Sequence, residues 1–192
     1  VFNQKEAFFR KVLLNITAKE QICPGYSCFY YCNQLTKIPA FPMKIAFASD
    51  HAGFSYKAIL IKELQNAGYD ILDLGTHSEA PSDYPDHAAD VALAIQEGRA
   101  ERGILICGSG VGVSVAVNKF KGIRAGVCHD TYSAHQSVEH DDANVLCIGQ
   151  RVVGIELVRE IIRAFLAARF THEERHQKRL AKVLEIENNN MK

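Results

Sequence analysis

The chain has 192 residues, and its 22 Lys and Arg balance its 22 Asp and Glu. Because no basic tract stands out, the charge pattern excludes the classes of protein that bind nucleic acid or anionic membrane surfaces. The apolar runs fall short of the ~20 residues that a membrane span needs. We therefore expect one domain with a sizeable core and with no nucleic-acid or membrane partner.

Six cysteines fall into two groups, and neither group is typical of a disulfide framework. They are Cys23, Cys28 and Cys32 near the N-terminus, and Cys107, Cys128 and Cys147 at or near the ends of apolar runs. Cysteines on strands in a chain of this size indicate a reducing, cytoplasmic compartment. The N-terminal spacing C-x4-C-x3-C has no histidine nearby and matches no common zinc pattern, so we expect no metal.

The chain changes character at Met43. Residues 1–42 mix helix-like apolar spacing with an irregular stretch rich in aromatic residues and cysteines. We expect them to form an N-terminal extension, poorly ordered or non-essential. Residues 43–187 show the regular pattern of a folded domain with a C-terminal helix, and residues 188–192 form a polar tail.

Beyond Met43, strand-like and helix-like segments alternate. Short apolar segments bounded by Gly, Asp or His predict five strands, at 44–49, 70–74, 102–107, 124–128 and 144–148. Amphipathic segments predict helices at 54–67, 85–96, 111–120, 131–139 and 154–169, and a polar helix follows at about 172–187. This alternation predicts an α/β fold: a three-layer α/β/α sandwich with a five-stranded parallel sheet, Rossmann/flavodoxin-like, with right-handed crossovers.

The most informative segment is an apolar strand that ends at Cys107 and turns through Gly108, Gly110 and Gly112 into a helix. A buried parallel strand delivers its last residue to the carboxyl edge of the sheet, where open α/β proteins bind ligands. Glycines in such a turn let backbone N–H groups point toward an anion. We therefore expect an active site that combines a thiol with an anion cradle.

Polar residues follow the other strands as well. They are Asp50 and His51 after the first strand, His129 and Asp130 after the fourth, and Gln150 and Arg151 after the fifth. Because the carboxyl ends of parallel strands share one edge, these groups are expected to converge on one crevice. Each also has an ordinary interpretation: Asp50, for example, is suited to capping the helix that follows it.

Several motifs in chain order carry a family resemblance. They are Ser49–Gly53, Ser82–Pro85, Gly103–Gly112, Asn118–Phe120, Gly122–Ala125, Glu139–Asn144 and Arg175–Arg179. From Met43 to about Glu187 the chain resembles the ribose-5-phosphate isomerase B family, which also contains enzymes acting on galactose 6-phosphate and allose 6-phosphate. The resemblance implies interconversion of ribose 5-phosphate and ribulose 5-phosphate through a cis-enediol, without a metal or organic cofactor.

The resemblance assigns the chemistry to the glycine turn. It makes Cys107 the base that moves a proton between C2 and C1, which requires a thiolate, whereas a free thiol is mostly protonated at neutral pH. Ser109 is expected to form a hydrogen bond or to relay the hydroxyl proton. Backbone N–H groups are expected to stabilise the enediolate oxygen, and they belong to Gly108, Gly110, Val111 and Gly112.

The remaining roles also come from the resemblance. His140 matches the histidine that opens the furanose ring, a task suited to an imidazole. Asp50 is expected to accept from a sugar hydroxyl, and His51 to lie near the phosphate. Tyr84 is expected either to form a wall of the pocket or simply to pack against the turn at Pro85.

Three arginines are expected to bind the phosphate, because guanidinium groups bind it bidentately and stay charged. They are Arg151, Arg175 and Arg179. Arg175 and Arg179 lie four residues apart and so share one helix face. In the family this pair reaches into the neighbouring subunit's site, which implies a homodimer with shared active sites; a tetramer stays open.

Three alternatives remain. Asp141 stands where many family members have asparagine, and an ionised carboxylate only accepts hydrogen bonds, so a hexose 6-phosphate remains a possible substrate. A non-catalytic nucleotide-binding domain would use the glycine turn with Asp130 on a ribose, but Val113 occupies the place of that fingerprint's third glycine. A thiol redox protein lacks its C-x-x-C motif here.

Overall fold

The structure, a computed structural model, describes residues 42–191. The extension predicted for residues 1–42, with its three cysteines, lies outside the described residues except for Pro42. Among residues 42–191, no helix is long and apolar enough to cross a membrane.

The centre of the fold is a five-stranded sheet in the order β2-β1-β3-β5-β4. Its strands are β1 (Lys44–Ser49), β2 (Asp70–Asp73), β3 (Arg102–Cys107), β4 (Ala125–Val127) and β5 (Val145–Gly149). Every neighbouring pair is parallel, as predicted. β1 and β3 have the predicted ends, whereas β4 is two residues shorter than expected.

Six helices cover the sheet or follow it within the described residues. They are α3 (Phe54–Asn66), α4 (Tyr84–Gln96), α5 (Val111–Val117), α6 (Thr131–Asp141), α7 (Ile155–Ala167) and α8 (Glu174–Asn190). The prediction that the helix after the glycine turn continues to Phe120 is wrong. α5 ends earlier because the side chain of Asn118 pairs with β4: its Nδ2 donates to Ala125 O at 2.9 Å and its Oδ1 accepts from Ala125 N at 2.9 Å.

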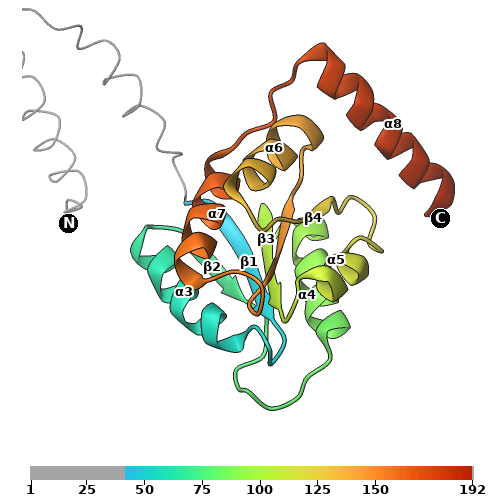
Figure 1. Ribbon diagram of the computed structural model, residues 1–192. Coiled ribbons are helices and arrows are strands. Elements are labelled where there is room, and N and C mark those ends of the chain that lie inside the picture. Colours follow the sequence, from blue (N-terminus) through green and yellow to red (C-terminus); the bar gives the residue numbers. More distant parts are fainter. Residues whose placement is uncertain (1–41, 192) are drawn as a thin grey trace, which may run out of the picture. The chain divides into compact units, whose positions relative to one another are not determined.

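The helices form two layers on opposite faces of the sheet (Figure 1). One apolar cluster joins the sheet to α3, α6 and α7, and the other joins it to α4 and α5. Because side chains alternate along a strand, Ile104 and Ile106 of β3 enter the first cluster, and Leu105 and Cys107 enter the second. The Cys107 side chain therefore belongs to the α4–α5 side, at the end of its strand.

Two buried cations brace this framework. Lys57 of α3 is 1 % exposed and pairs with Asp73 at the end of β2. Arg102, at the start of β3, donates to Phe165 O and to Ala168 O (2.7 Å), carbonyls at the end of α7. Burial lowers the pKa of Arg102 to about 10, but its guanidinium stays charged at neutral pH. These contacts tie α3 and α7 to the sheet.

α8 projects from the body beside α6 (Figure 1). Gly122 N donates to Glu187 Oε1 at 2.7 Å, so the far part of the helix returns to the turn before β4. A cavity of about 350 Å³ lies beneath it, between α8 and the edge of β4. Val183, Leu184 and Ile186 remain 50 %, 36 % and 64 % exposed, so α8 presents apolar side chains that its own chain leaves uncovered.

Candidate active site

The carboxyl edge of the sheet carries an open cavity of about 420 Å³. Its lining comes from the ends of β1, β3 and β5 and from the start of α4. The lining residues are Asp50, His51, Ala52, Tyr84, Cys107, Gly108, Ser109, Gly112, Arg151 and Val152. Residues separated by about a hundred positions in the sequence therefore meet in one crevice, as the shared strand edge predicts.

Cys107 lies at the floor of this cavity and is 5 % exposed. The backbone N–H of Gly110 donates to Cys107 Sγ at 3.0 Å, so the turn fixes the position of the sulfur. Gly110 has a φ of +81°, a left-handed conformation that glycine adopts without strain. This turn therefore needs glycine in order to aim an N–H group at the sulfur.

The β5 end holds the glycine turn in place. Gln150 N donates to Cys107 O at 2.9 Å, and Arg151 N donates to Gly108 O at 3.0 Å. A Cβ atom on Gly149 would lie 2.7 Å from the carbonyl carbon and oxygen of Ser109, so only glycine fits there. The sequence motifs did not single out this role of Gly149; the register that places it opposite Cys107 shows it.

The amides expected to form the anion hole are not all free. Gly110 N is bonded to the sulfur, and Val111 N donates to Ser109 Oγ at 3.3 Å. A Cβ on Gly108 would lie 3.6 Å from the Arg151 side chain, so this arginine extends over the turn. In this structure, the amides of Gly110 and Val111 therefore donate to the side chains of Cys107 and Ser109.

Asp50 and His51 form the opposite wall of the cavity. Asp50 Oδ1 accepts from Ala52 N at 2.9 Å and Gly53 N at 3.1 Å, so this carboxylate both organises the turn before α3 and lines the cavity. His51 Nδ1 lies 3.2 Å from Ser82 N and 3.3 Å from Ser82 O, so Ser82 holds the ring by its Nδ1 edge. Ser82 Oγ also accepts from His51 N at 3.2 Å. Ser82 is thus a supporting residue that the sequence placed in a motif but not in the site.

Tyr84 begins α4 and is 40 % exposed. A Cβ on Gly112 would lie 3.0 Å from the Tyr84 ring, so the ring lies directly against the backbone of the turn. Tyr84 therefore forms part of the cavity wall, which is one of the two positions expected for it.

Four of the predicted site residues lie elsewhere in the chain. His140 and Asp141 end α6, and Arg175 and Arg179 lie on the first turns of α8. Crossover helices run back along the sheet, so the end of α6 lies at the amino edge, just before β5 starts at Val145. Because β5 pairs with β3 along its whole length, this edge is about 13 Å from Cys107, at about 3.3 Å per residue. These four residues therefore lie apart from the crevice that the strand ends form within one chain, and their predicted roles stay predictions.

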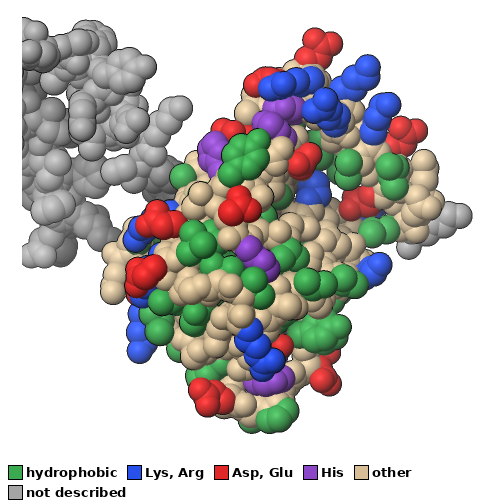
Figure 2. Space-filling view, in the orientation of Figure 1, with side chains coloured by type: hydrophobic (Ala, Val, Ile, Leu, Met, Phe, Trp, Pro, Cys, Tyr) green, Lys and Arg blue, Asp and Glu red, His purple; other side chains and the backbone are tan. Residues whose placement is uncertain are grey.

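The second group forms a cluster of its own. His140 stacks against His176 of α8 with ring centroids 4.0 Å apart. Arg175 and Arg179 are exposed on either side of His176. Figure 2 shows basic side chains gathered over α8, with histidine side chains next to them.

Asp130 takes a structural role. Its Oδ1 accepts from Ser133 N at 2.7 Å and caps α6, and this hydrogen bond lowers the pKa of the carboxyl group. His129 Nε2 accepts from Gly149 N at 3.1 Å. A nucleotide-binding domain would need Asp130 to bind a ribose, but here the Asp130 carboxylate caps α6.

The other two described cysteines differ from Cys107. Burial raises the pKa of the Cys128 and Cys147 thiols, so both behave as core residues.

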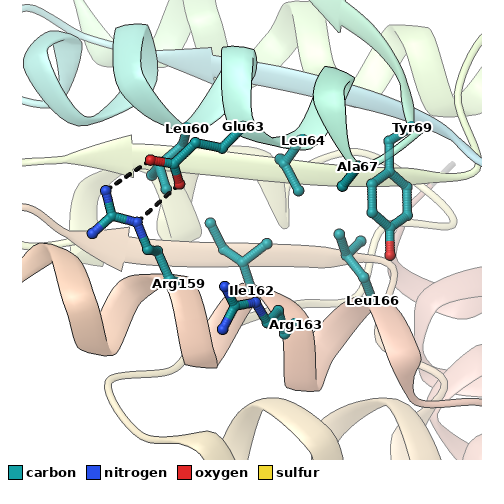
Figure 3. Close-up of a pocket in the computed structure, with 9 residues that line it drawn as sticks. All are labelled: Leu60, Glu63, Leu64, Ala67, Tyr69, Arg159, Ile162, Arg163 and Leu166. Carbon is teal, nitrogen blue, oxygen red and sulfur yellow. Dashed lines mark hydrogen bonds and ion pairs between the residues drawn. The ribbon is translucent and has the colours of Figure 1, made fainter.

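Another pocket lies between α3 and α7. It has an apolar floor, and its rim is the ion pair of Glu63 with Arg159, at 2.7 Å and 2.9 Å (Figure 3). Its lining includes no cysteine or histidine. The Cys107 cavity is therefore the better candidate for catalysis.

Fold and site together define an α/β enzyme with a buried cysteine at an open cavity that Asp50, His51 and Arg151 also line. Residues 45–183 match the model of a family described as Ribose/Galactose Isomerase. The chain belongs to this family of isomerases.

The match to this chain extends over most of the length of each relative. Ribose-5-phosphate isomerase B of Escherichia coli is 49% identical over 144 residues, which is 75% of this chain and 96% of that protein. D-erythrulose-4-phosphate isomerase 2 of Mycolicibacterium smegmatis is 42% identical over 132 residues, 67% of this chain and 86% of that protein. The solved structure of Clostridium thermocellum ribose-5-phosphate isomerase B gives a TM-score of 0.75 at 46% identity, covering 77% of this chain and 99% of that one.

Proposed function

We propose that this isomerase interconverts ribose 5-phosphate and ribulose 5-phosphate, with Cys107 as the base. The observation that carries the proposal is the position of Cys107 Sγ, at the floor of a cavity and 3.0 Å from the N–H of Gly110. The name of the Escherichia coli relative supports the choice of sugar.

The reaction moves one proton between adjacent carbons. The Cys107 thiolate takes the proton from C2 of the open-chain aldose, and the C2 electron pair becomes part of a cis-enediolate with its charge on O1. The same thiol returns the proton to C1, and Ser109 relays the O2 hydroxyl proton to O1, which leaves a ketone at C2 and a hydroxyl at C1. The overall change is an isomerisation, so no external oxidant or reductant enters.

The surrounding residues bind the ends of the substrate. Asp50 is 7 % exposed, and its carboxylate accepts from a sugar hydroxyl. His51, held at Nδ1 by Ser82, donates from Nε2 toward the phosphate. Arg151, lying over Gly108, supplies a charged donor on the same side of the cavity.

Two copies of the chain complete the site. Within one chain, His140, Asp141, Arg175 and Arg179 lie at the sheet edge opposite Cys107, so they cannot serve the same chain's cavity. A homodimer in which each chain presents its α6–α8 corner to the other chain's Cys107 resolves this separation. The exposed apolar side chains of α8 support the same arrangement, because a second copy would bury them.

A substrate panel tests the proposed activity. Ribose 5-phosphate, allose 6-phosphate, galactose 6-phosphate and erythrulose 4-phosphate are assayed on the wild type and on Cys107→Ser. We expect the highest kcat/KM with ribose 5-phosphate, and a loss of at least about a hundredfold in the variant. The second candidate substrate is erythrulose 4-phosphate, favoured by the name of the Mycolicibacterium smegmatis relative. A higher kcat/KM with any other sugar of the panel overturns the choice of ribose 5-phosphate.

Mixing two inactive variants tests the shared site. Cys107→Ser and His140→Asn are each inactive alone, but a mixed dimer contains one site with both groups intact. Random exchange of subunits then restores roughly a quarter of wild-type activity, since about half of the dimers are mixed and each has one working site. Absence of any recovery after verified subunit exchange contradicts the shared-site arrangement.

A further inference from the structure

His176 is a buried histidine that the proposed reaction does not use. It lies in the first turn of α8 and is 1 % exposed. Its ring stacks on His140 with centroids 4.0 Å apart and planes inclined by 35°. On the other side of the pair, Gln136 Nε2 lies 2.9 Å from His140 Nδ1. With the amide as donor, His140 Nδ1 accepts, and its Nε2 carries the proton of the neutral ring.

The loop before α8 fixes the His176 ring. Thr171 Oγ1 lies 2.7 Å from His176 Nδ1 and donates to Glu139 O at 3.2 Å. Glu139 O also accepts from Thr171 N at 3.1 Å, so this threonine satisfies a free carbonyl at the end of α6. A hydroxyl has a single proton; once that proton goes to Glu139 O, His176 Nδ1 must donate to Thr171.

The surroundings of His176 favour a neutral ring. Its Nε2 is buried and has no hydrogen-bond partner among the described residues. Burial lowers the pKa of His176, and the nearby His140, Arg175 and Arg179 act in the same direction, opposed by Glu173. The buried, unpartnered Nε2 of His176 therefore suits a ring that supports its neighbour and does not itself exchange protons with a substrate.

We propose that His176 is a positioning residue for His140: it fixes the plane of the His140 ring and leaves that ring as the proton carrier of the pair. The proposal rests on the proposed role of His140 in opening the furanose ring. It also explains why α8 carries His176 between Arg175 and Arg179, since one helix then places both the phosphate donors and the support of the imidazole. His176 itself touches no substrate.

The chemistry of the two sugars separates ring opening from proton transfer. Ribose 5-phosphate is mainly a furanose and must open before C2 can lose its proton. Ribulose 5-phosphate has its O5 esterified and cannot close a furanose on C2, so it enters the site in open form. Exchange of its C1 hydrogen with solvent therefore needs the base but not the ring-opening acid.

The test uses His176→Asn, whose amide keeps a donor for Thr171 but lacks the ring. We expect kcat from ribose 5-phosphate to fall about tenfold, a part of what a general acid contributes, with KM within about twofold. Deuterium incorporation at C1 of ribulose 5-phosphate, followed by NMR, stays within about twofold of wild type. His135→Gln, an exposed histidine on the same helix as His140, is the control and keeps both rates.

Thr171→Val and Thr171→Ser keep the proposal testable where His176→Asn folds poorly. Valine removes the hydroxyl and should give the same selective loss, whereas serine restores it. Equal losses in the two reactions, or no loss in either, overturn the positioning role and indicate that His176 only packs α8 against α6. A wild type that exchanges no C1 hydrogen overturns the proposed function itself, and the role of His176 with it.

Discussion

Gly149→Ala is the substitution for which the structure makes the sharpest quantitative prediction. A Cβ atom at this position would lie 2.7 Å from both the carbonyl carbon and the oxygen of Ser109, and 2.9 Å from its Cα. Carbon atoms in contact lie about 3.5–4.0 Å apart, so the turn must retreat by about 0.8 Å. The neighbouring atoms are backbone, and a change of side-chain rotamer cannot relieve the contact.

The retreat acts on catalysis because Ser109 lies between Cys107 and Gly110. Moving Ser109 lengthens the 3.0 Å contact from Gly110 N to Cys107 Sγ and displaces the sulfur from the reacting carbons. A misplacement of about 1 Å can cost on the order of a hundredfold in rate. We therefore expect kcat to fall about a hundredfold, about 2.7 kcal/mol in activation free energy, and the unfolding free energy to fall by about 1–3 kcal/mol from overpacking.

The assay is steady-state isomerisation combined with urea unfolding, and Gly154→Ala is the matched control. Gly154 precedes α7, five residues further along the chain, and a Cβ there meets nothing within 4 Å. The control should keep its kcat within about twofold and its stability within about 0.5 kcal/mol. A Gly149→Ala enzyme with wild-type kcat, or a Gly154→Ala enzyme equally impaired, refutes the reasoning.

Three further predictions concern stability. Asp73→Ala leaves the buried Lys57 ammonium unpaired and should lower the unfolding free energy by about 2 kcal/mol. This loss is smaller than for a fully buried pair because Asp73 is partly exposed. In urea titrations, the double variant with Lys57→Met should recover most of the lost stability. Arg102→Met frees two carbonyls at the end of α7 and should cost about 2–3 kcal/mol, whereas the exposed Arg99→Ala costs less than about 0.5 kcal/mol; similar losses in both would contradict the capping role. Burial and His140 lower the pKa of His176 below its ordinary 6.5. As the pH falls below 6.5, the unfolded chain therefore binds more protons than the folded chain, and the unfolding free energy decreases. Urea titrations between pH 5 and 8 should show a smaller decline in His176→Asn; an identical pH dependence in the variant contradicts this assignment.

The sequence predicts the framework of this protein well because its signals are local. Alternating apolar strands and amphipathic helices predict the parallel sheet, and the strand ending at Cys107 predicts the carboxyl-edge cavity. The helix ends are harder, because side chains from elsewhere decide them. Asn118 ends α5 by pairing with Ala125 of β4, a contact that no periodicity within α5 contains.

The site is predictable only as a set of residue types. Asp50, His51 and Arg151 reach the Cys107 cavity, as the common strand edge predicts. His140 does not, because it ends a helix rather than a strand, and a crossover helix ends at the opposite edge. The supporting contacts of Ser82 and Gly149 depend on distances between segments that the sequence leaves far apart.

Hydrogen exchange at the reacting carbon tests the role of Cys107 most directly. Ribulose 5-phosphate is incubated in D₂O with the wild type and with Cys107→Ser, and deuterium at C1 is followed by NMR alongside binding of the sugar phosphate. The account predicts rapid exchange with the wild type, and a loss of at least about a hundredfold in the variant with binding retained. Exchange within tenfold of wild type in Cys107→Ser would show that another group removes the proton.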